Sequence, residues 1–298
     1  MTFFLTLVAK KELNKTHLDT VCGILNRSFS SAEFNWLHEG KAAEIQLPEC
    51  INDKIFENIV STIDKDRIDA FLTPSENRRK KLLIADMDST IVTSETLDDI
   101  AGELGIGDIV SKITARAMRG ELDFKAALTE RVALLAGKST DVLETIRNKT
   151  ELTGGALSFV KTMKKNGAIC VLISGGFTYF TEHVADLCGF NYHHGNILST
   201  QNNRITGHVE EPILDKSAKL SFMQEYVLDH KLNMSDVLAI GDGANDYDII
   251  SNAGLGIGFH PKDTLKKASR NHIRHGDLRA ALYAQGYTKD EIIQEKGV

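Results

Sequence analysis

The sequence lacks two features that mark whole classes of protein. Its 298 residues include four cysteines, Cys22, Cys50, Cys170 and Cys188, and no two of them form a Cys-x-x-Cys spacing. The absence of this spacing argues against a thiolate zinc site or a disulfide framework. It predicts reduced, mostly buried thiols. Positive charge is not in excess either, because 35 lysines and arginines face 41 aspartates and glutamates. The net charge of −6 therefore excludes a general attraction to nucleic acid or to an anionic membrane.

Long apolar runs are also missing. The apolar start of the chain, residues 1–10, has no basic leader and is too short to span a bilayer. It predicts a first β-strand and a cytoplasmic protein. With 298 residues, of which 42% are hydrophobic and 26% charged, the chain is expected to form a main globular domain with a smaller companion.

The first part of the chain alternates between the two periodicities that favour strands and helices. The predicted elements are strands at 3–9, 32–37, 41–47 and 67–72, with helices at 14–26 and 53–63. This β-α-β-β-α-β order is typical of a small α+β ferredoxin-like module, which we expect over residues 1–76. A polar, proline-opened stretch follows, and its basic run over residues 78–81 is interpreted as a solvated linker at 77–81 rather than a nucleic-acid patch.

The main domain is expected over residues 82–298. Apolar strands are predicted at 82–85, 168–173, 237–240 and 255–259, and helical stretches separate them. Such alternation favours an α/β fold with a doubly wound, Rossmann-like parallel sheet. Between about 95 and 150 there are only helical patterns, at 96–103, 110–119 and 124–135. A helical insert directly after the first strand is placed to act as a lid.

Three polar motifs each directly follow one of these apolar strands. They are Asp86-Met87-Asp88, Ser174-Gly175-Gly176, and Asp242-Gly243-Ala244-Asn245-Asp246. Because the carboxyl ends of parallel strands meet at one edge of a sheet, we expect the motifs to converge there. Clustered carboxylates repel one another unless a cation with oxygen ligands lies between them, and Mg²⁺ fits because the motifs contain no histidine or cysteine.

The serine and glycines of the second motif suit a phosphate group. A hydroxyl can donate a hydrogen bond, and glycine lets backbone N–H groups approach an anion closely. The alternative is a simple strand-to-helix turn. Lys219, near the start of the next predicted helix, could place its ammonium against the phosphate, with Lys216 as a competing candidate and a surface position as the simpler interpretation.

With these motifs in this order, the chain resembles the haloacid dehalogenase (HAD) superfamily, and within it the phosphoserine phosphatases, over about residues 81–279. The resemblance depends on residues 86–90, on Ser174-Gly175-Gly176-Phe177, on Lys219 and on residues 241–246. The second carboxylate, Asp88, separates the chain from the dehalogenase branch. P-type pumps share similar motifs but need membrane spans that the sequence lacks.

The resemblance implies a hydrolase of serine biosynthesis that cleaves O-phospho-L-serine through an aspartyl-phosphate. Asp86 would be the nucleophile, and Asp88 would serve first as the general acid and then as the general base. Mg²⁺ would be held by Asp86, by the backbone carbonyl of Asp88 and by Asp242. The phosphoryl group would be held by Ser174, by a backbone N–H of Gly175 or Gly176, and by Lys219, with Asn245 and Asp246 orienting the metal's waters and the lysine from behind.

The resemblance also assigns substrate recognition to the helical cap. Four cap residues are implicated, namely Glu95, Met118, Phe124 and Arg131. Arg131 can hold an α-carboxylate in a bidentate manner, and Glu95 can pair with an α-ammonium. Without the resemblance, Glu95 is explained by its place near a helix start, and Arg131 by an exposed surface. The two apolar residues would roof the site, or they could be ordinary cap core.

Several alternatives remain at this stage. The chain could instead act on another small phosphomonoester, or it could be a regulatory protein with a retired catalytic domain, although every catalytic motif is intact. The first module resembles amino-acid-binding ACT domains, and we rank dimerisation, giving a homodimer, or structural support ahead of serine sensing. The adjacent pair His193-His194 is expected at the surface, with its side chains pointing in opposite directions.

Overall fold

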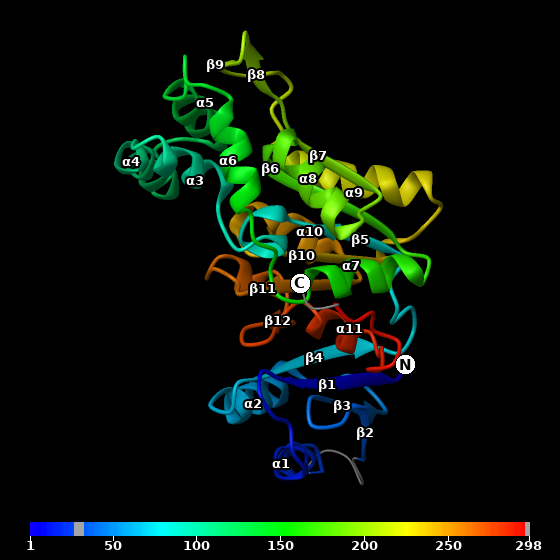
Figure 1. Ribbon diagram of the computed structural model, residues 1–298. Coiled ribbons are helices and arrows are strands. Elements are labelled where there is room, and N and C mark those ends of the chain that lie inside the picture. Colours follow the sequence, from blue (N-terminus) through cyan, green and yellow to red (C-terminus); the bar gives the residue numbers. More distant parts are fainter. Residues whose placement is uncertain (27–32, 296–298) are drawn as a thin grey trace.

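The computed structural model describes residues 1–26 and 33–295, which form two main sheets, each with its own helices, and a separate two-stranded hairpin (Figure 1). The first is a four-stranded antiparallel sheet of order β2-β3-β1-β4. Its elements are β1 (Phe3–Ala9), α1 (Lys15–Leu25), β2 (Phe34–His38), β3 (Ala42–Leu47), α2 (Asp53–Asp64) and β4 (Ile68–Pro74). The predicted β-α-β-β-α-β order is confirmed. Residue 32 of the predicted second strand lies outside the described residues.

The second sheet has six parallel strands in the order β12-β11-β10-β5-β6-β7, which confirms the predicted α/β class. The strands are β5 (Leu82–Ala85), β6 (Ile169–Phe177), β7 (Tyr192–Asn196), β10 (Val237–Gly241), β11 (Leu255–Phe259) and β12 (His272–Ile273). The helices outside the cap are α7 (Ala156–Lys165), α8 (Thr178–Cys188), α9 (Lys216–Asp229), α10 (Tyr247–Asn252) and α11 (Ala280–Ala284).

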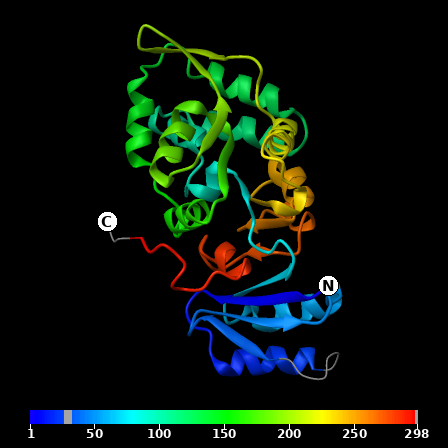
Figure 2. The same cartoon turned by 90° about the vertical axis from the view of Figure 1, so that its right-hand side faces the viewer.

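Both faces of the parallel sheet are buried, which explains why its strands are continuous apolar runs in the sequence. Alternate residues of β5 belong to different hydrophobic clusters. Leu82 and Ile84 pack with Met223 of α9 and Ile249 of α10, whereas Leu83 packs in the cluster that contains α7 and α8. The helices thus sandwich the strands, as Figures 1 and 2 show.

A helical cap lies between β5 and α7, as predicted. It consists of α3 (Thr96–Glu103), α4 (Gly107–Met118), α5 (Phe124–Ala133) and α6 (Asp141–Lys149). A hairpin that the sequence patterns did not indicate, β8 (Leu198–Gln201) with β9 (Arg204–Val209), stands beside α5 at the top of Figure 1. Gly137 N–H donates to the Ile205 carbonyl, which ties the cap to this hairpin.

The helices are short, and several begin at identifiable caps. Asn14 accepts a hydrogen bond from the His17 backbone at the start of α1, and Asp215 accepts from Ser217 and Ala218 at the start of α9. The longest described helix, α9, has 14 residues. No helix in the described ranges combines the length and the apolar character needed to cross a bilayer.

The four cysteines are free, as expected. Cys22, Cys170 and Cys188 are buried, whereas Cys50 is exposed. Burial raises the pKa of both Cys170 and Cys188 to about 12. These two thiols therefore stay protonated and unreactive at neutral pH.

The basic stretch before β5 is solvated only in part. Arg79 and Lys81 are exposed, as expected, but the expectation is wrong for Arg78 and Lys80. Arg78 forms an ion pair with Glu44 at 2.7 Å and lies over the ring of Phe4 at 4.0 Å. Lys80 is 4% exposed and donates to the backbone carbonyl of Ser235 at 2.7 Å. Composition alone misled here because a charged side chain can be buried once carboxylates and backbone carbonyls accept its hydrogen bonds.

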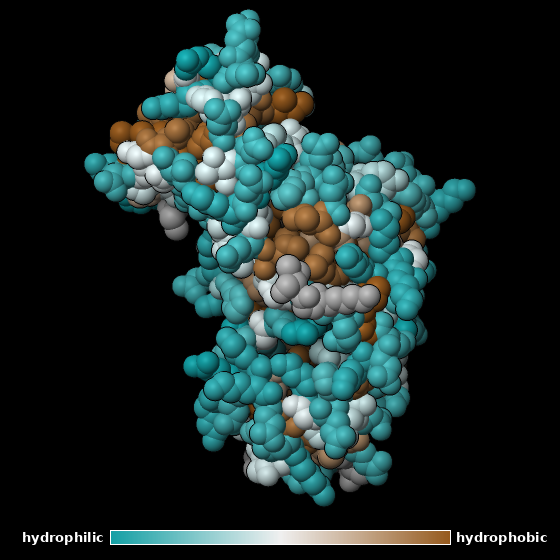
Figure 3. Space-filling view, viewed as in Figure 1, coloured by the Kyte–Doolittle hydropathy of each residue, from teal (hydrophilic) through white to brown (hydrophobic). Residues whose placement is uncertain are grey.

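Further contacts join the two sheets. The buried carboxylate of Asp69 on β4 accepts hydrogen bonds from three successive backbone N–H groups, those of residues 274–276 after β12. The Asn271 side chain, 7% exposed, accepts from Leu72 N–H at 2.8 Å and donates to the Leu72 carbonyl at 3.4 Å. The antiparallel sheet thus lies directly against the parallel one (Figure 2), and the face seen in Figure 3 is mostly hydrophilic around it.

Candidate active site

The three motifs predicted to converge do meet at the carboxyl edge of the parallel sheet. The first and third motifs directly follow β5 and β10, whereas the second forms the end of β6, which extends to Phe177 and so beyond the predicted 168–173. These three strands are adjacent in the strand order. Together with the cap they enclose a cavity of about 210 Å³. It is lined by Asp86, Asp88, Glu95, Thr96, Leu97, Phe124, Leu128, Arg131, Ser174, Gly175, Gly176, Phe177, Asp242, Asn245 and Lys262.

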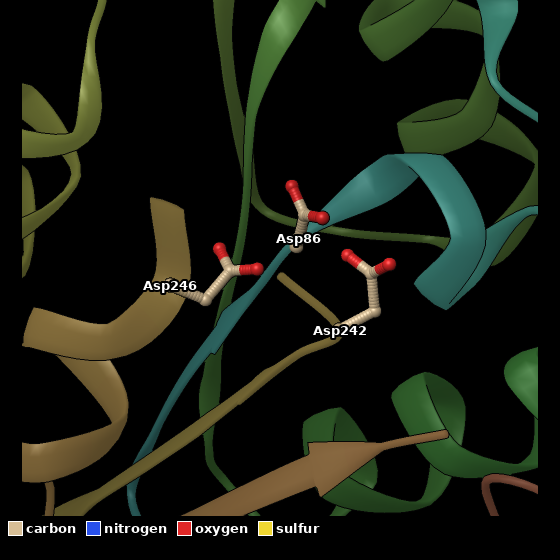
Figure 4. Close-up of side chains that lie close together, drawn as sticks. All are labelled: Asp86, Asp242 and Asp246. Carbon is tan, nitrogen blue, oxygen red and sulfur yellow. The ribbon is translucent and has the colours of Figure 1, made fainter. Parts of the chain in front are cut away.

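An acidic centre lies at the floor of this site. Among the described residues, oxygens of Asp86, Asp242 and Asp246 lie within 4.8 Å of one another, and Figure 4 shows their carboxylates gathered around a common space. All three residues are buried. The group could bind a metal, and its oxygen-only donors fit a hard cation such as Mg²⁺ better than zinc. Asp246, which we expected behind the metal ligands, belongs to this group, but its Oδ1 and Oδ2 also accept hydrogen bonds from Lys219 Nζ and the Gly243 N–H.

Lys219 reaches this acidic centre from α9. Its side chain is buried, and its Nζ lies 2.5 Å from Asp86 Oδ1 and 2.6 Å from Asp246 Oδ1. Burial alone would lower the pKa of this ammonium, but the two carboxylates more than compensate and raise it. The lysine is therefore charged. Lys216, the competing candidate, is exposed one turn earlier on the same helix.

The surroundings of the Asp86 carboxyl shift its pKa in opposing directions. Burial and the neighbouring Asp246 raise its pKa well above the ordinary value, while Lys219 lowers it. A cation placed among the three carboxylates would act in the same direction as Lys219 and favour the ionised form. The ionised form is the one that can act as a nucleophile.

Asp88 has different partners from Asp86. Its Oδ1 accepts a hydrogen bond from Thr96 N–H at 2.9 Å, and its Oδ2 accepts from Ser174 Oγ at 3.0 Å. Burial raises the pKa of this carboxyl, and the hydrogen bonds oppose that shift. The two aspartates, two residues apart, therefore sit in distinct environments, which suits a division of labour between nucleophile and proton donor.

The glycines of the second motif leave space that a side chain would fill. A Cβ at Gly175 would lie 2.9 Å from the ring of Phe124, and one at Gly176 would lie 3.1 Å from Asp88 Oδ2. The Gly176 N–H donates to Ser174 Oγ at 2.8 Å. The open backbone at this point faces the cavity, as a site for a phosphoryl group requires.

Three of the four cap residues expected to recognise the substrate line the cavity. Glu95 accepts a hydrogen bond from Ser89 Oγ at 2.9 Å, and burial followed by the charge of Asp88 raises its pKa. Burial lowers the pKa of Arg131, whose Nε donates to the Ala127 carbonyl. Phe124 projects toward the second motif. The side chain of Met118 lies outside the described part of the chain.

Lys262 is a site residue that the sequence analysis missed. Its Nζ lies 2.9 Å from Asp242 Oδ2 and 3.8 Å from Glu95 Oε1. Its backbone N–H also donates to the Asp242 carbonyl at 2.9 Å. The signal available was its place just after the predicted strand 255–259, because the loop after that strand ends at the same sheet edge.

The histidine pair lies on β7, an edge strand of the parallel sheet that β6 separates from β5. His193 bonds Thr181 of α8, whereas His194 bonds Tyr226 of α9 and stacks on Phe222 at 3.9 Å. The side chains point to opposite faces, as expected. The expected surface exposure is wrong, because helices cover both faces of this edge strand and leave the histidines half-buried.

Comparisons with known proteins agree on one family. The family model described as haloacid dehalogenase-like hydrolase matches residues 83–251. The phosphoserine phosphatase of Archaeoglobus fulgidus is 44% identical over 68% of this chain, and the chain spans only 59% of that protein's length. The phosphoserine phosphatase of Lactococcus lactis is 38% identical over 68% of this chain and 94% of its own length.

A solved structure described as a phospho-aspartyl intermediate analogue of phosphoserine phosphatase is also similar. It superposes with a TM-score of 0.65 and 36% identity, covering 71% of this chain and all of the other. The family match over residues 83–251 falls on the parallel-sheet part of the chain and its cap.

Proposed function

The chain belongs to the haloacid dehalogenase-like hydrolases, and from this premise we propose that it hydrolyses O-phospho-L-serine to L-serine and inorganic phosphate. One observation carries the proposal. The buried Asp86 lines a small cavity that is also lined by a carboxylate, Glu95, and a guanidinium, Arg131. Relatives that carry the name phosphoserine phosphatase support the substrate.

In the first step an Asp86 carboxylate oxygen attacks phosphorus, and the bond from phosphorus to the seryl oxygen breaks. Asp88 gives its proton to that oxygen, so serine leaves as the neutral alcohol. The raised pKa of Asp88 supports this assignment, because a carboxyl that holds its proton longer is the better acid near neutral pH. The product is an aspartyl-phosphate on Asp86.

In the second step water attacks the aspartyl-phosphate. Asp88, now ionised, takes a proton from that water, and the bond between phosphorus and the Asp86 oxygen breaks. Phosphate leaves and both aspartates return to their starting states. Ser174 Oγ, which donates to Asp88 in the free protein, can turn to a phosphoryl oxygen when substrate is bound.

Positive charge and hydrogen-bond donors around the phosphoryl group come from three sources. Lys219 supplies a buried ammonium beside Asp86, and the Gly176 N–H lies at the base of the cavity. Mg²⁺ held by Asp86, Asp242 and the Asp88 backbone carbonyl, with Asn245 and Asp246 behind, would supply further positive charge against the phosphoryl oxygens. These donors fit the ion because all of them are oxygens, and the Asp86 and Asp242 carboxylates are buried.

The cap selects the rest of the substrate. Arg131 pairs with the α-carboxylate and Glu95 with the α-ammonium, so the two charges at a fixed separation favour a zwitterion. Phe124, which lines the cavity and contacts Gly175, excludes water while the phosphoenzyme forms.

A second candidate substrate class rests on Lys262. Its ammonium lies 3.8 Å from Glu95 Oε1. It therefore already neutralises part of the Glu95 charge with which a substrate ammonium would pair. Small phosphomonoesters with a carboxylate but no amine are therefore the runner-up.

Hydrolysis of O-phospho-L-serine should be measured alongside phosphoglycolate, sugar phosphates and nucleotides, with Mg²⁺ and again with EDTA. We expect phosphoserine to be hydrolysed fastest and EDTA to abolish release of phosphate, because the three carboxylates need a counter-charge. Faster hydrolysis of phosphoglycolate would favour the runner-up. Equal rates on all esters would remove the substrate assignment while leaving the phosphatase chemistry in place.

Arg131→Ala should lower kcat/KM for phosphoserine by about 10- to 100-fold, because a charge-assisted pair to the carboxylate is lost. Hydrolysis of an aryl phosphate, which has no carboxylate, should change far less. Arg116→Ala is the matched control, since this cap arginine pairs with Glu130 at 2.7 Å outside the cavity. Equal losses on both substrates would show that Arg131 supports the cap rather than reading the amino acid.

The first module is proposed as a structural support that also permits a homodimer. Arg78 and Asp69 bind it to the parallel-sheet domain through an ion pair and three backbone N–H groups. Serine sensing by an ACT-like module ranks below this role, because its supporting observation is the order of elements alone.

A further inference from the structure

Asn196, the last residue of β7, is a buried amide that the reaction scheme does not use. Its side chain is 2% exposed and makes three hydrogen bonds, all to backbone. The Nδ2 group donates to the Gly175 carbonyl at 2.8 Å and to the Leu214 carbonyl at 3.4 Å, and Oδ1 accepts from Leu214 N–H at 2.7 Å. A buried amide that joins two separate backbone segments fixes their relative position.

The first of these segments is the Ser174-Gly175-Gly176 motif at the end of β6. The Gly175 carbonyl and the Gly176 N–H belong to the same peptide unit, which is trans and planar. When Asn196 holds the oxygen on one side, the N–H is directed to the other side. There it donates to Ser174 Oγ at 2.8 Å, and that hydroxyl donates to Asp88 at 3.0 Å.

The second segment leads into α9. Leu214 is followed by Asp215, the N-cap of α9, and Lys219 lies one turn into that helix. Both backbone groups of Leu214 are held by the Asn196 amide. The same side chain therefore anchors the peptide that presents an N–H to the cavity and the helix start that presents the Lys219 ammonium.

We propose that Asn196 is a positioning residue that keeps the Gly176 N–H and Lys219 at the spacing needed to hold a phosphoryl group. The inference rests on the proposed function, because it assigns Asn196 to the phosphate-binding half of that site. Asn196 lies outside the cavity lining and acts through Gly175 and Leu214.

Asn196→Asp tests the proposal because it keeps the shape and the acceptor but loses the donor. Its carboxylate would face the carbonyls of Gly175 and Leu214 without hydrogen atoms between them. We expect kcat/KM to fall by about 10- to 100-fold and calorimetric binding of inorganic phosphate to weaken by about tenfold or more. Asn196→Ala, which is neutral, gives the same comparison if the aspartate variant does not fold.

Asn271→Asp is the matched control. Asn271 is similarly buried and holds Leu72 N–H and carbonyl at 2.8 and 3.4 Å, so its backbone contacts copy those of Asn196 to Leu214. It lies between the two sheets, away from the cavity. The control should leave phosphate affinity and kcat/KM within about twofold of the wild type.

A double-mutant cycle with Ser174→Ala separates positioning from general destabilisation. Because Asn196 acts through the Gly176 N–H that bonds Ser174, its loss and the loss of Ser174 should be non-additive in kcat/KM, whereas Asn271→Asp should add to Ser174→Ala. Additivity for Asn196, or phosphate affinity equal to that of the Asn271 variant, would overturn the inference. A wild type that hydrolyses no phosphomonoester would overturn the proposed function instead, and the phosphate-binding comparison would still decide the role of Asn196.

Discussion

Asp86→Asn should abolish turnover and phosphoenzyme formation together, with kcat lowered by at least about four orders of magnitude. The amide has nearly the same shape as the carboxylate but cannot displace an alcohol from phosphorus. Asp86 is 4% exposed, and its Oδ1 lies 2.5 Å from Lys219 Nζ, so the substitution changes a group in the interior of the site. Release of phosphate under saturating substrate and trapping of acid-stable protein-bound phosphate are the two measurements.

Asp236→Asn is the matched control for this variant. Asp236 is a second buried aspartate, 2% exposed, and it lies just before β10 at the amino-terminal end of the sheet, where it pairs with Lys81. Its replacement should lower stability without affecting the chemistry. Turnover retained by Asp86→Asn, or phosphoenzyme still formed by it, would remove Asp86 as the nucleophile and leave Asp88 as the candidate.

Lys219→Met should affect both stability and activity. Without divalent cation, removing the ammonium leaves Asp86 and Asp246 buried without their partner, so the free energy of unfolding should fall by about 3–5 kcal/mol. With Mg²⁺ present, kcat/KM should fall by about 10²- to 10³-fold, because a buried charge next to the phosphoryl group is lost. Urea unfolding in EDTA and steady-state kinetics give the two values.

Lys216→Met on the same helix is the control for Lys219. Its side chain is exposed, so both quantities should stay close to those of the wild type. A larger loss of activity in Lys216→Met than in Lys219→Met would contradict the site as described. Loss of stability without loss of activity in Lys219→Met would limit the lysine to a structural counter-ion.

The parts of the fold that could be predicted from sequence share a physical cause. A strand buried on both faces must be apolar at every position, so Leu82–Ala85 is recognisable, and the charge at Asp86 marks its end. Parallel strands then bring Asp86, Ser174 and Asp242 to one edge without any knowledge of the chain between them. Lys219 was a candidate from its place near a helix start, with Lys216 competing, and the family resemblance selected it.

Other features depend on contacts that no local pattern encodes. Lys262 is an ordinary lysine in a loop until β11 is placed beside β10, where its Nζ reaches Asp242. Arg78 looks solvated in the sequence, but Glu44 of β3 and Phe4 of β1 contact it in the fold. The hairpin β8–β9 has polar, weakly alternating strands that pack on the cap, so its pairing partner had to be known first.

The contact between the two sheets bears on how freely the first module can be separated from the rest. Val8 and Phe71 of its sheet share one hydrophobic cluster with Leu278 and Tyr283 of the other domain. Deleting the module would expose Leu278 and Tyr283 and leave the three N–H groups after β12 without Asp69. The compact Lactococcus relative, which this chain covers over 94% of its length, matches only 68% of this chain. In this chain the parallel-sheet domain therefore depends on the first module to bury part of its apolar surface and to accept the hydrogen bonds of those N–H groups.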